Sequence, residues 1–162
     1  MTPRVFWACV ATTTALALSL GLALSPPHPP TRTDGGAAVL LGTVAGALLF
    51  AAALRRRPAL RRLATAPSAV GRQLFLGLCA ANEEVLWRRV LLGELLPVGG
   101  LAALAVSSAG FAVAHRRARP LHVATGVTFG SLYLVTGVLG ASVAAHWVYN
   151  ALVGSLVERV PP

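Results

Sequence analysis

The most informative stretch of this sequence is Ala81-Asn82-Glu83-Glu84-Val85-Leu86-Trp87-Arg88-Arg89, in which four charged side chains lie within a long apolar segment. The chain of 162 residues has only five acidic residues, and two of them are adjacent here. A charged side chain in the hydrocarbon of a bilayer costs roughly 2.5–3.5 kcal/mol. These charges are therefore expected to be paired, to face a wet cavity or to take part in chemistry.

Helix geometry predicts different roles for the two glutamates. Glu84 and Arg88 are four positions apart with the acid on the N-terminal side, which is the favourable order for an ion pair along a helix. Side chains of adjacent residues point about 100° apart, so Glu83 and Glu84 are not expected to share a partner. Glu83 is therefore predicted to face a group from another segment.

The composition is that of an integral membrane protein. Apolar residues make up 56% of the chain and charged residues only 12%, whereas a soluble domain carries about 25% charged residues. The net charge of +9 comes from arginine alone, because the chain has no lysine. These arginines flank apolar runs, so they indicate membrane topology and contacts with anionic lipids, and no binding to nucleic acid is expected.

Six apolar segments predict an all-α fold, a polytopic transmembrane bundle of about six spans. The final apolar stretch, residues 121–157, is too long for one crossing of a bilayer, so it is predicted to turn near Thr136 and Gly137. The predicted spans are residues 5–24, 37–54, 70–96, 99–115, 121–136 and 139–157.

Arginine clusters predict the orientation of these spans. The loops at 55–62 and 116–119 are rich in arginine, and the positive-inside rule places them in the cytoplasm. With six spans, both termini then lie in the cytoplasm.

Residues 1–66 are interpreted as a two-span region with a basic cytoplasmic loop, and residues 67–162 as a catalytic helical core. The first span is interpreted as an anchor, with a cleaved signal peptide as the alternative.

Polar side chains recur at helical spacing in three of the predicted spans. The three motifs are Glu83-Glu84-x-x-x-Arg88, Phe111-x-x-x-His115 and His146-x-x-x-Asn150. His146 and Asn150 are four residues apart, so they lie on one face of their helix. Their depths, counted from the cytoplasmic ends of the spans, are compatible with those of Glu83 and His115. These four side chains are therefore expected to converge.

Such a cluster is suited to hydrolysis of an amide by water. A carboxylate with a histidine can accept a proton from water, and a histidine with an asparagine can donate hydrogen bonds to an oxyanion. Structural roles remain the alternative, because polar groups inside a membrane protein also serve as buried ion pairs and interhelical hydrogen bonds. The two other histidines, His28 and His122, are interpreted as structural.

The order of the three motifs resembles the CPBP family of intramembrane glutamic proteases. This family includes the CAAX prenyl endopeptidases and bacteriocin-processing or self-immunity proteins. The resemblance covers residues 83–150, with each motif on a separate hydrophobic segment. It implies an integral protein of the bacterial cytoplasmic membrane, acting on a membrane protein or a lipidated peptide.

The resemblance also implies a role for each motif residue. Glu83 matches the catalytic glutamate, and His115 matches the histidine that helps it to activate water. His146 and Asn150 match the two residues that bind the oxyanion. Glu84 and Arg88 match the supporting residues of the first motif. A glutamic protease of this kind requires neither a metal nor a cofactor.

Two other functions are compatible with the same residues. A non-catalytic member of the family would act as a bacteriocin immunity factor or a membrane scaffold. A zinc-dependent membrane protease would use Glu83, His115 and His146 as three ligands and leave one coordination position open.

Overall fold

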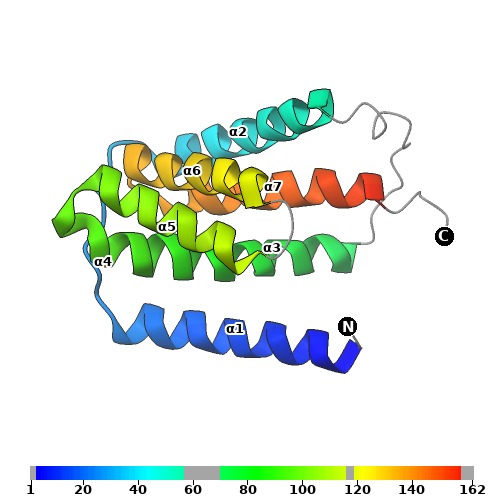
Figure 1. Cartoon of the computed structure of the whole chain (residues 1–162), viewed down its shortest axis with the longest axis horizontal. Helices are drawn as coiled ribbons and strands as arrows, with labels where there is room; N and C mark the ends of the chain where they lie inside the picture. The colour runs from blue at the N-terminus through cyan, green and yellow to red at the C-terminus, as the bar shows by residue number, and fades with distance from the viewer. Residues whose placement is uncertain (1–2, 57–69, 116–118, 158–162) are drawn as a thin grey trace.

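The structure, a computed structural model, describes residues 3–56, 70–115 and 119–157, and within these ranges it is helical and contains no strand. The described residues form six helical rods that run alternately in opposite directions (Figure 1). The helices are α1 (Pro3–Ala23), α2 (Gly35–Arg56), α3 (Val70–Glu84), η2 (Val85–Leu92), α4 (Gly93–Leu95), η3 (Leu96–Val98), α5 (Gly100–Ala114), α6 (Arg119–Thr136) and α7 (Leu139–Val157). The predicted all-α class is confirmed, and each rod ends within two residues of its predicted bounds.

The third rod changes its winding next to the two glutamates. It begins as α3 and becomes the π-helix η2 directly after Glu84, and it then ends through α4 and the 3-10 turn η3. The backbone N–H of Gly93 donates to the carbonyl of Arg88, five residues earlier. The helical segment predicted over residues 70–96 is confirmed, but the sequence does not predict the π-helical winding within it. Because η2 contains no glycine or proline, nothing local signals the wider turn.

Helix α2 packs closely along α7 through small residues. A Cβ atom added at Gly42 would collide with the backbone of Ala141, and one added at Gly46 would collide with that of Ala145. Two glycines four residues apart thus face two alanines four residues apart, which is the spacing that lets helix backbones approach in a membrane. This contact joins the N-terminal part of the chain to its last helix.

Helix α6 uses a second pair of glycines against α5. The sequence Gly126-x-x-x-Gly130 predicts close helix packing, and the structure confirms it. A Cβ atom at Gly126 would lie 3.2 Å from the Cα of Ser108, and one at Gly130 would meet the side chain of Leu104. On α6, His122 lies four residues before Gly126 and therefore on the same face, so this close contact continues toward His122.

The connector between α1 and α2 lies across one end of the bundle. The guanidinium of Arg89 donates a hydrogen bond to the carbonyl of Pro26 (2.9 Å), and the backbone N–H of Arg32 donates to the carbonyl of Thr136 (3.0 Å). The predicted turn after Thr136 is confirmed, with Gly137 at a φ of 71° that favours glycine. This end of the bundle is therefore held by the connector.

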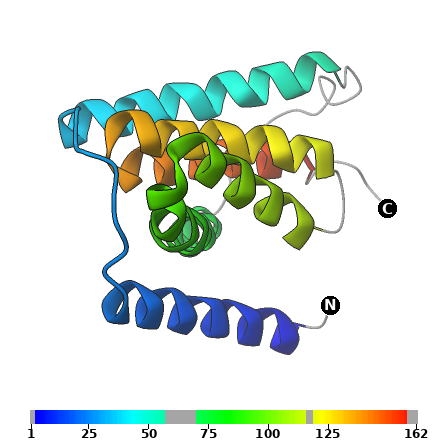
Figure 2. The same cartoon turned by 60° about the vertical axis from the view of Figure 1, so that its left-hand side comes forward.

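Helix α1 lies at the outside of the bundle, against α3 and η2 (Figures 1 and 2). Its side chains are largely exposed, and Leu22 is 86% exposed. Where α1 meets α3, the amide of Asn82 donates a hydrogen bond to the hydroxyl of Thr14 (2.7 Å), and Trp7 packs edge-on against Phe75. An apolar helix with so little cover is suited to contact with lipid.

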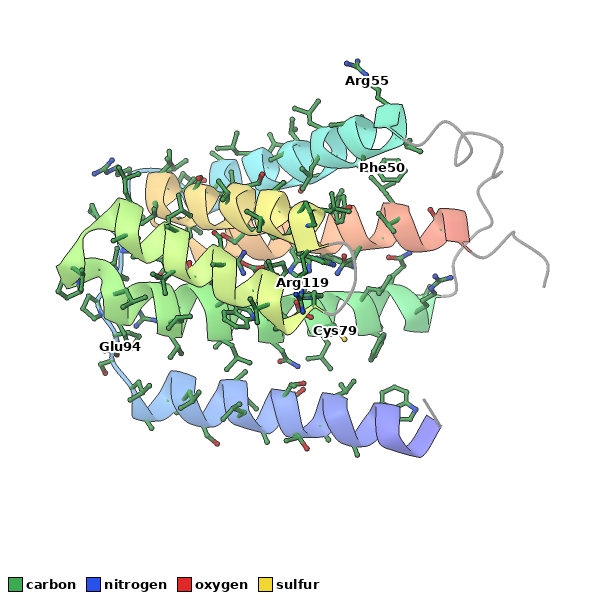
Figure 3. The ribbon with its side chains drawn as sticks, in the orientation of Figure 1. Phe50, Arg55, Cys79, Glu94 and Arg119 are labelled. Carbon is green, nitrogen blue, oxygen red and sulfur yellow. The ribbon has the colours of Figure 1, made fainter. Side chains whose placement is uncertain are left out.

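One helix in the described residues, Gly35–Arg55, is long and apolar enough to cross a bilayer by length and composition. The helices Val10–Ala23 and Gly100–Ala114 are apolar but shorter. The beginning of α1 and the end of α7 lie at the same end of the bundle (Figure 1). Arg55 lies at this end, and Glu94 lies at the opposite end (Figure 3).

Candidate active site

A pocket of about 210 Å³ lies between α3, α5, α6 and α7. Its lining combines ionisable, polar and aromatic side chains: Glu83, Phe111, His115, His122, Thr125, Phe129, His146, Tyr149 and Asn150. The structure thus brings together the four side chains that the sequence predicts to converge. They come from the end of α3, the end of α5 and the middle of α7.

The Glu83 carboxylate lies between two imidazoles. Its Oε2 atom is 3.7 Å from Nε2 of His115 and 3.9 Å from Nε2 of His146. This oxygen is buried and has no hydrogen-bond partner among the described residues, although the Glu83 side chain as a whole is 35% exposed. The carboxylate therefore faces the pocket, at distances from both imidazoles that are too long for direct hydrogen bonds.

His115 is anchored through its other ring nitrogen. Its Nδ1 lies 2.7 Å from the carbonyl oxygen of Phe111, one turn earlier. Since a carbonyl can only accept, this nitrogen carries the hydrogen. In the neutral ring, Nε2 then has a lone pair and faces Glu83. His115 follows the last residue of α5, with an extended backbone at φ −95° and ψ 113°.

His146 is anchored in a similar way, but by a carboxylate. Its Nδ1 lies 2.8 Å from Oε1 of Glu84, and the other oxygen of Glu84 lies 3.1 Å from Nε of Arg88. The predicted ion pair between Glu84 and Arg88 is thus present, and both side chains are fully buried. Arg88 also donates to the carbonyl of Gly126 (3.1 Å), and its guanidinium lies 4.8 Å from the centre of the Phe111 ring.

The prediction that Glu83 and Glu84 share no partner is wrong. His146 faces both, with Nδ1 toward Glu84 and Nε2 toward Glu83. The prediction assumed that a partner interacts through a single atom, but an imidazole has two nitrogens on different edges of its ring. Two carboxylates that diverge on the helix can therefore lie at two edges of one ring.

Rings from α6 lie against both imidazoles. Phe129 stacks on His146, with the ring centres 4.8 Å apart and 20° between the planes. His122 stacks on His115, at 4.0 Å and 24°. Sequence reasoning missed a place for His122 in the site, because it belongs to none of the three motifs. Its spacing of seven residues from Phe129, two helical turns, is the signal that puts both on one face.

No group of three or more histidine, cysteine, aspartate or glutamate side chains in the described ranges is arranged to hold a metal ion. The zinc hypothesis therefore gains no support from the geometry and is left to metal analysis.

Comparison with protein-family models adds an independent finding. The model described as type II CAAX prenyl endopeptidase Rce1-like matches residues 65–152, which is more than half of the chain. The match includes all three motifs and every residue that lines the pocket. Neither the curated proteins nor the solved structures contain a match to the chain. The chain belongs to the Rce1-like family of type II CAAX prenyl endopeptidases, a protease family within the CPBP group.

Proposed function

We propose that the protein is an endopeptidase that works within the membrane, with water as nucleophile and without a metal. Its substrate is a protein that is embedded in the membrane or held there by a C-terminal anchor or a lipid. The observation that carries the proposal is the position of Glu83. Its carboxylate faces two Nε2 atoms whose rings are already anchored through Nδ1.

Glu83 and His115 are suited to hold and activate a water molecule. The carboxylate oxygen and Nε2 of His115 both accept hydrogen bonds, and their separation of 3.7 Å lets one water lie about 2.8 Å from each. Such a water donates one hydrogen to each acceptor, so its lone pairs face the pocket. As the water attacks the substrate carbonyl, one of its protons moves to Glu83.

His146 and Asn150 are suited to hold the oxyanion that forms on the carbonyl oxygen. They lie one turn apart on α7, and both line the pocket. A donated hydrogen bond from Nε2 of His146 requires a ring that carries both hydrogens. With such a ring, the charges of Glu83, Glu84, Arg88 and His146 sum to zero. The C–N bond then breaks as Glu83 returns its proton to the leaving nitrogen, and a carboxylic acid and an amine are released.

The membrane arrangement belongs to the same proposal. We infer a polytopic protein of the bacterial cytoplasmic membrane, with both termini and the arginine-rich loops in the cytoplasm, next to anionic lipids. Supporting this, the start of α1, the end of α7 and Arg55 lie at one end of the bundle (Figures 1 and 3). The polar groups in α3 and α7 lower the hydropathy of these helices, and buried side chains of this kind are expected to face a bundle interior.

Substitution of Glu83 tests the proposal most directly. The purified full-length protein is assayed with a quenched fluorescent peptide that ends in a farnesylated C-a-a-X sequence and with the same peptide without the lipid. Glu83→Gln and His115→Ala are each expected to abolish measurable cleavage, because water then lacks an acceptor. Asn150→Ala is expected to retain a low cleavage rate, about 10²–10³-fold below that of wild type, because it removes one oxyanion donor.

The controls separate this proposal from its two alternatives. A Glu83→Gln protein that accumulates normally and keeps its full biological effect would support a scaffold or an immunity factor. One equivalent of zinc that is lost in His146→Ala, with activity restored by zinc after chelation, would support a metalloprotease. Leu48→Ala is the matched control variant, since Leu48 is 64% exposed on α2 and does not line the pocket.

A further inference from the structure

His122 lies in the first turn of α6, outside the three motifs, and its imidazole lines the same pocket as Glu83. We propose that His122 is a positioning residue, which stacks on His115 and holds Nε2 of His115 at the Glu83 carboxylate. This inference rests on the proposed hydrolysis, because it assigns His115 its part in activating water. It adds a residue that the sequence motifs do not contain.

The imidazole of His115 retains rotational freedom at the end of α5. His115 follows the last residue of α5, and one hydrogen bond, from Nδ1 to the carbonyl of Phe111, holds its ring. A ring that is held by one such bond can still turn about the line between donor and acceptor. The direction of Nε2 therefore depends on what lies against the faces of the ring.

Two rings supply those contacts, and they differ in geometry. Phe111 lies 4.5 Å from the His115 ring centre at 48° between the planes, which is a tilted contact. His122 lies closer, at 4.0 Å, and is nearly parallel, at 24°. A nearly parallel ring restricts rotation of the imidazole plane more than a tilted ring does, so His122 is the contact that sets the plane of His115.

The site contains the same arrangement of an anchored and stacked imidazole twice. His146 is tied at Nδ1 by Glu84 and backed by the nearly parallel ring of Phe129. His115 is tied at Nδ1 by a carbonyl and backed by His122. In both, Nε2 points toward Oε2 of Glu83, at 3.9 and 3.7 Å. Helix α6 thus supplies one backing ring for each imidazole, from positions seven residues apart.

The test compares two variants of His122 in the full-length protein. His122→Ala removes the ring and is expected to lower kcat about 10- to 100-fold with KM unchanged, because small misplacement of a reacting group has effects of this size. His122→Phe keeps a flat ring and is expected to stay within about threefold of wild type. Val123→Ala is the matched control, since Val123 is the next residue on α6 and is 43% exposed.

A spectroscopic measurement tests the inference without any substrate. In the detergent-solubilised protein with ¹⁵N-labelled histidine, the ring protons of His115 should show an upfield shift from the stacked ring. The shift is expected to be lost in His122→Ala and retained in His122→Phe.

Several outcomes would overturn the inference. They are wild-type kcat in His122→Ala, an effect on KM alone, equal loss of activity in both His122 variants, or an unchanged His115 spectrum in His122→Ala. Glu83→Gln is measured alongside. An active Glu83→Gln would overturn the proposed function itself, whereas an inactive Glu83→Gln with a fully active His122→Ala would overturn only the role of His122.

Discussion

Glu84 determines the orientation of two buried groups at once. One carboxylate oxygen lies 2.8 Å from Nδ1 of His146, and the other lies 3.1 Å from Nε of Arg88. Neither Glu84 nor Arg88 is exposed to solvent at all. The pair is therefore expected to contribute to folding as well as to the orientation of His146.

Glu84→Gln and Arg88→Ala are expected to destabilise the protein more than Glu83→Gln does. Removal of one partner leaves the other charge buried and unpaired, a loss of roughly 3–5 kcal/mol. Glu83 is 35% exposed, and its neighbours His115 and His146 lie 3.7 and 3.9 Å away, beyond direct hydrogen bonds, so its substitution should mainly affect activity. The measurement is the yield and the thermal unfolding midpoint of each variant in detergent. Equal yield and equal midpoint for Glu84→Gln and wild type would show that the ion pair is not structural.

At the residue scale, the polar residues of the site could be predicted from the sequence, but the tautomers of its histidines could not. Helix spacing alone predicts the pairing of Glu84 with Arg88 and the shared face of His146 and Asn150. The anchor of His115 is a backbone carbonyl, which every residue has, so no side-chain pattern could single it out. The stack of His122 on His115 forms between two helices, and it depends on how α5 and α6 pack.

At the scale of helices, the small residues of α2 and α7 fix how these two elements meet. Gly46→Ala is expected to destabilise the bundle by about 1–3 kcal/mol, because an added methyl group would overlap the backbone of Ala145. Gly71→Ala is the matched control, since nothing lies within 4 Å of a Cβ at this helical position. The measurement is again the unfolding midpoint. An equal effect in both variants would mean that the close contact of α2 with α7 is not needed for stability.

The helix bounds were predictable because proline, glycine and arginine interrupt the apolar runs. Which helices pack against each other was less predictable. The glycines at 126 and 130 suggest a close contact but do not name α5 as the partner, and the same spacing at Gly42 and Gly46 faces alanines in α7. The π-helix η2 has no local signal, since its eight residues are apolar apart from two arginines. Its wider turn lies directly after Glu84, next to the site, as is common for π-helices.

At the scale of the whole molecule, charge and helix direction indicate the same orientation. Arg55 lies at the end of the bundle where α1 begins and α7 ends, and the acidic Glu94 lies at the other end (Figure 3). Arginine is retained on the cytoplasmic side of a membrane, while acidic residues contribute little to orientation. The end of the bundle that contains Arg55 is therefore expected to face the cytoplasm.

Reporter fusions test this orientation. A reporter after Arg57 and one after Arg159 are expected to read as cytoplasmic, and one after Gly99, in the turn between η3 and α5, as external. Because the rods alternate in direction, an even number of crossings must separate the first two positions, and an odd number must separate Gly99 from each of them. Alkaline phosphatase and a fluorescent protein, active on opposite sides of the membrane, give a positive signal for each outcome.

An external reading at Arg57 would reverse the orientation. A cytoplasmic reading at all three positions would mean that the third rod does not cross the membrane, so the Glu83 pocket would not be a site within it.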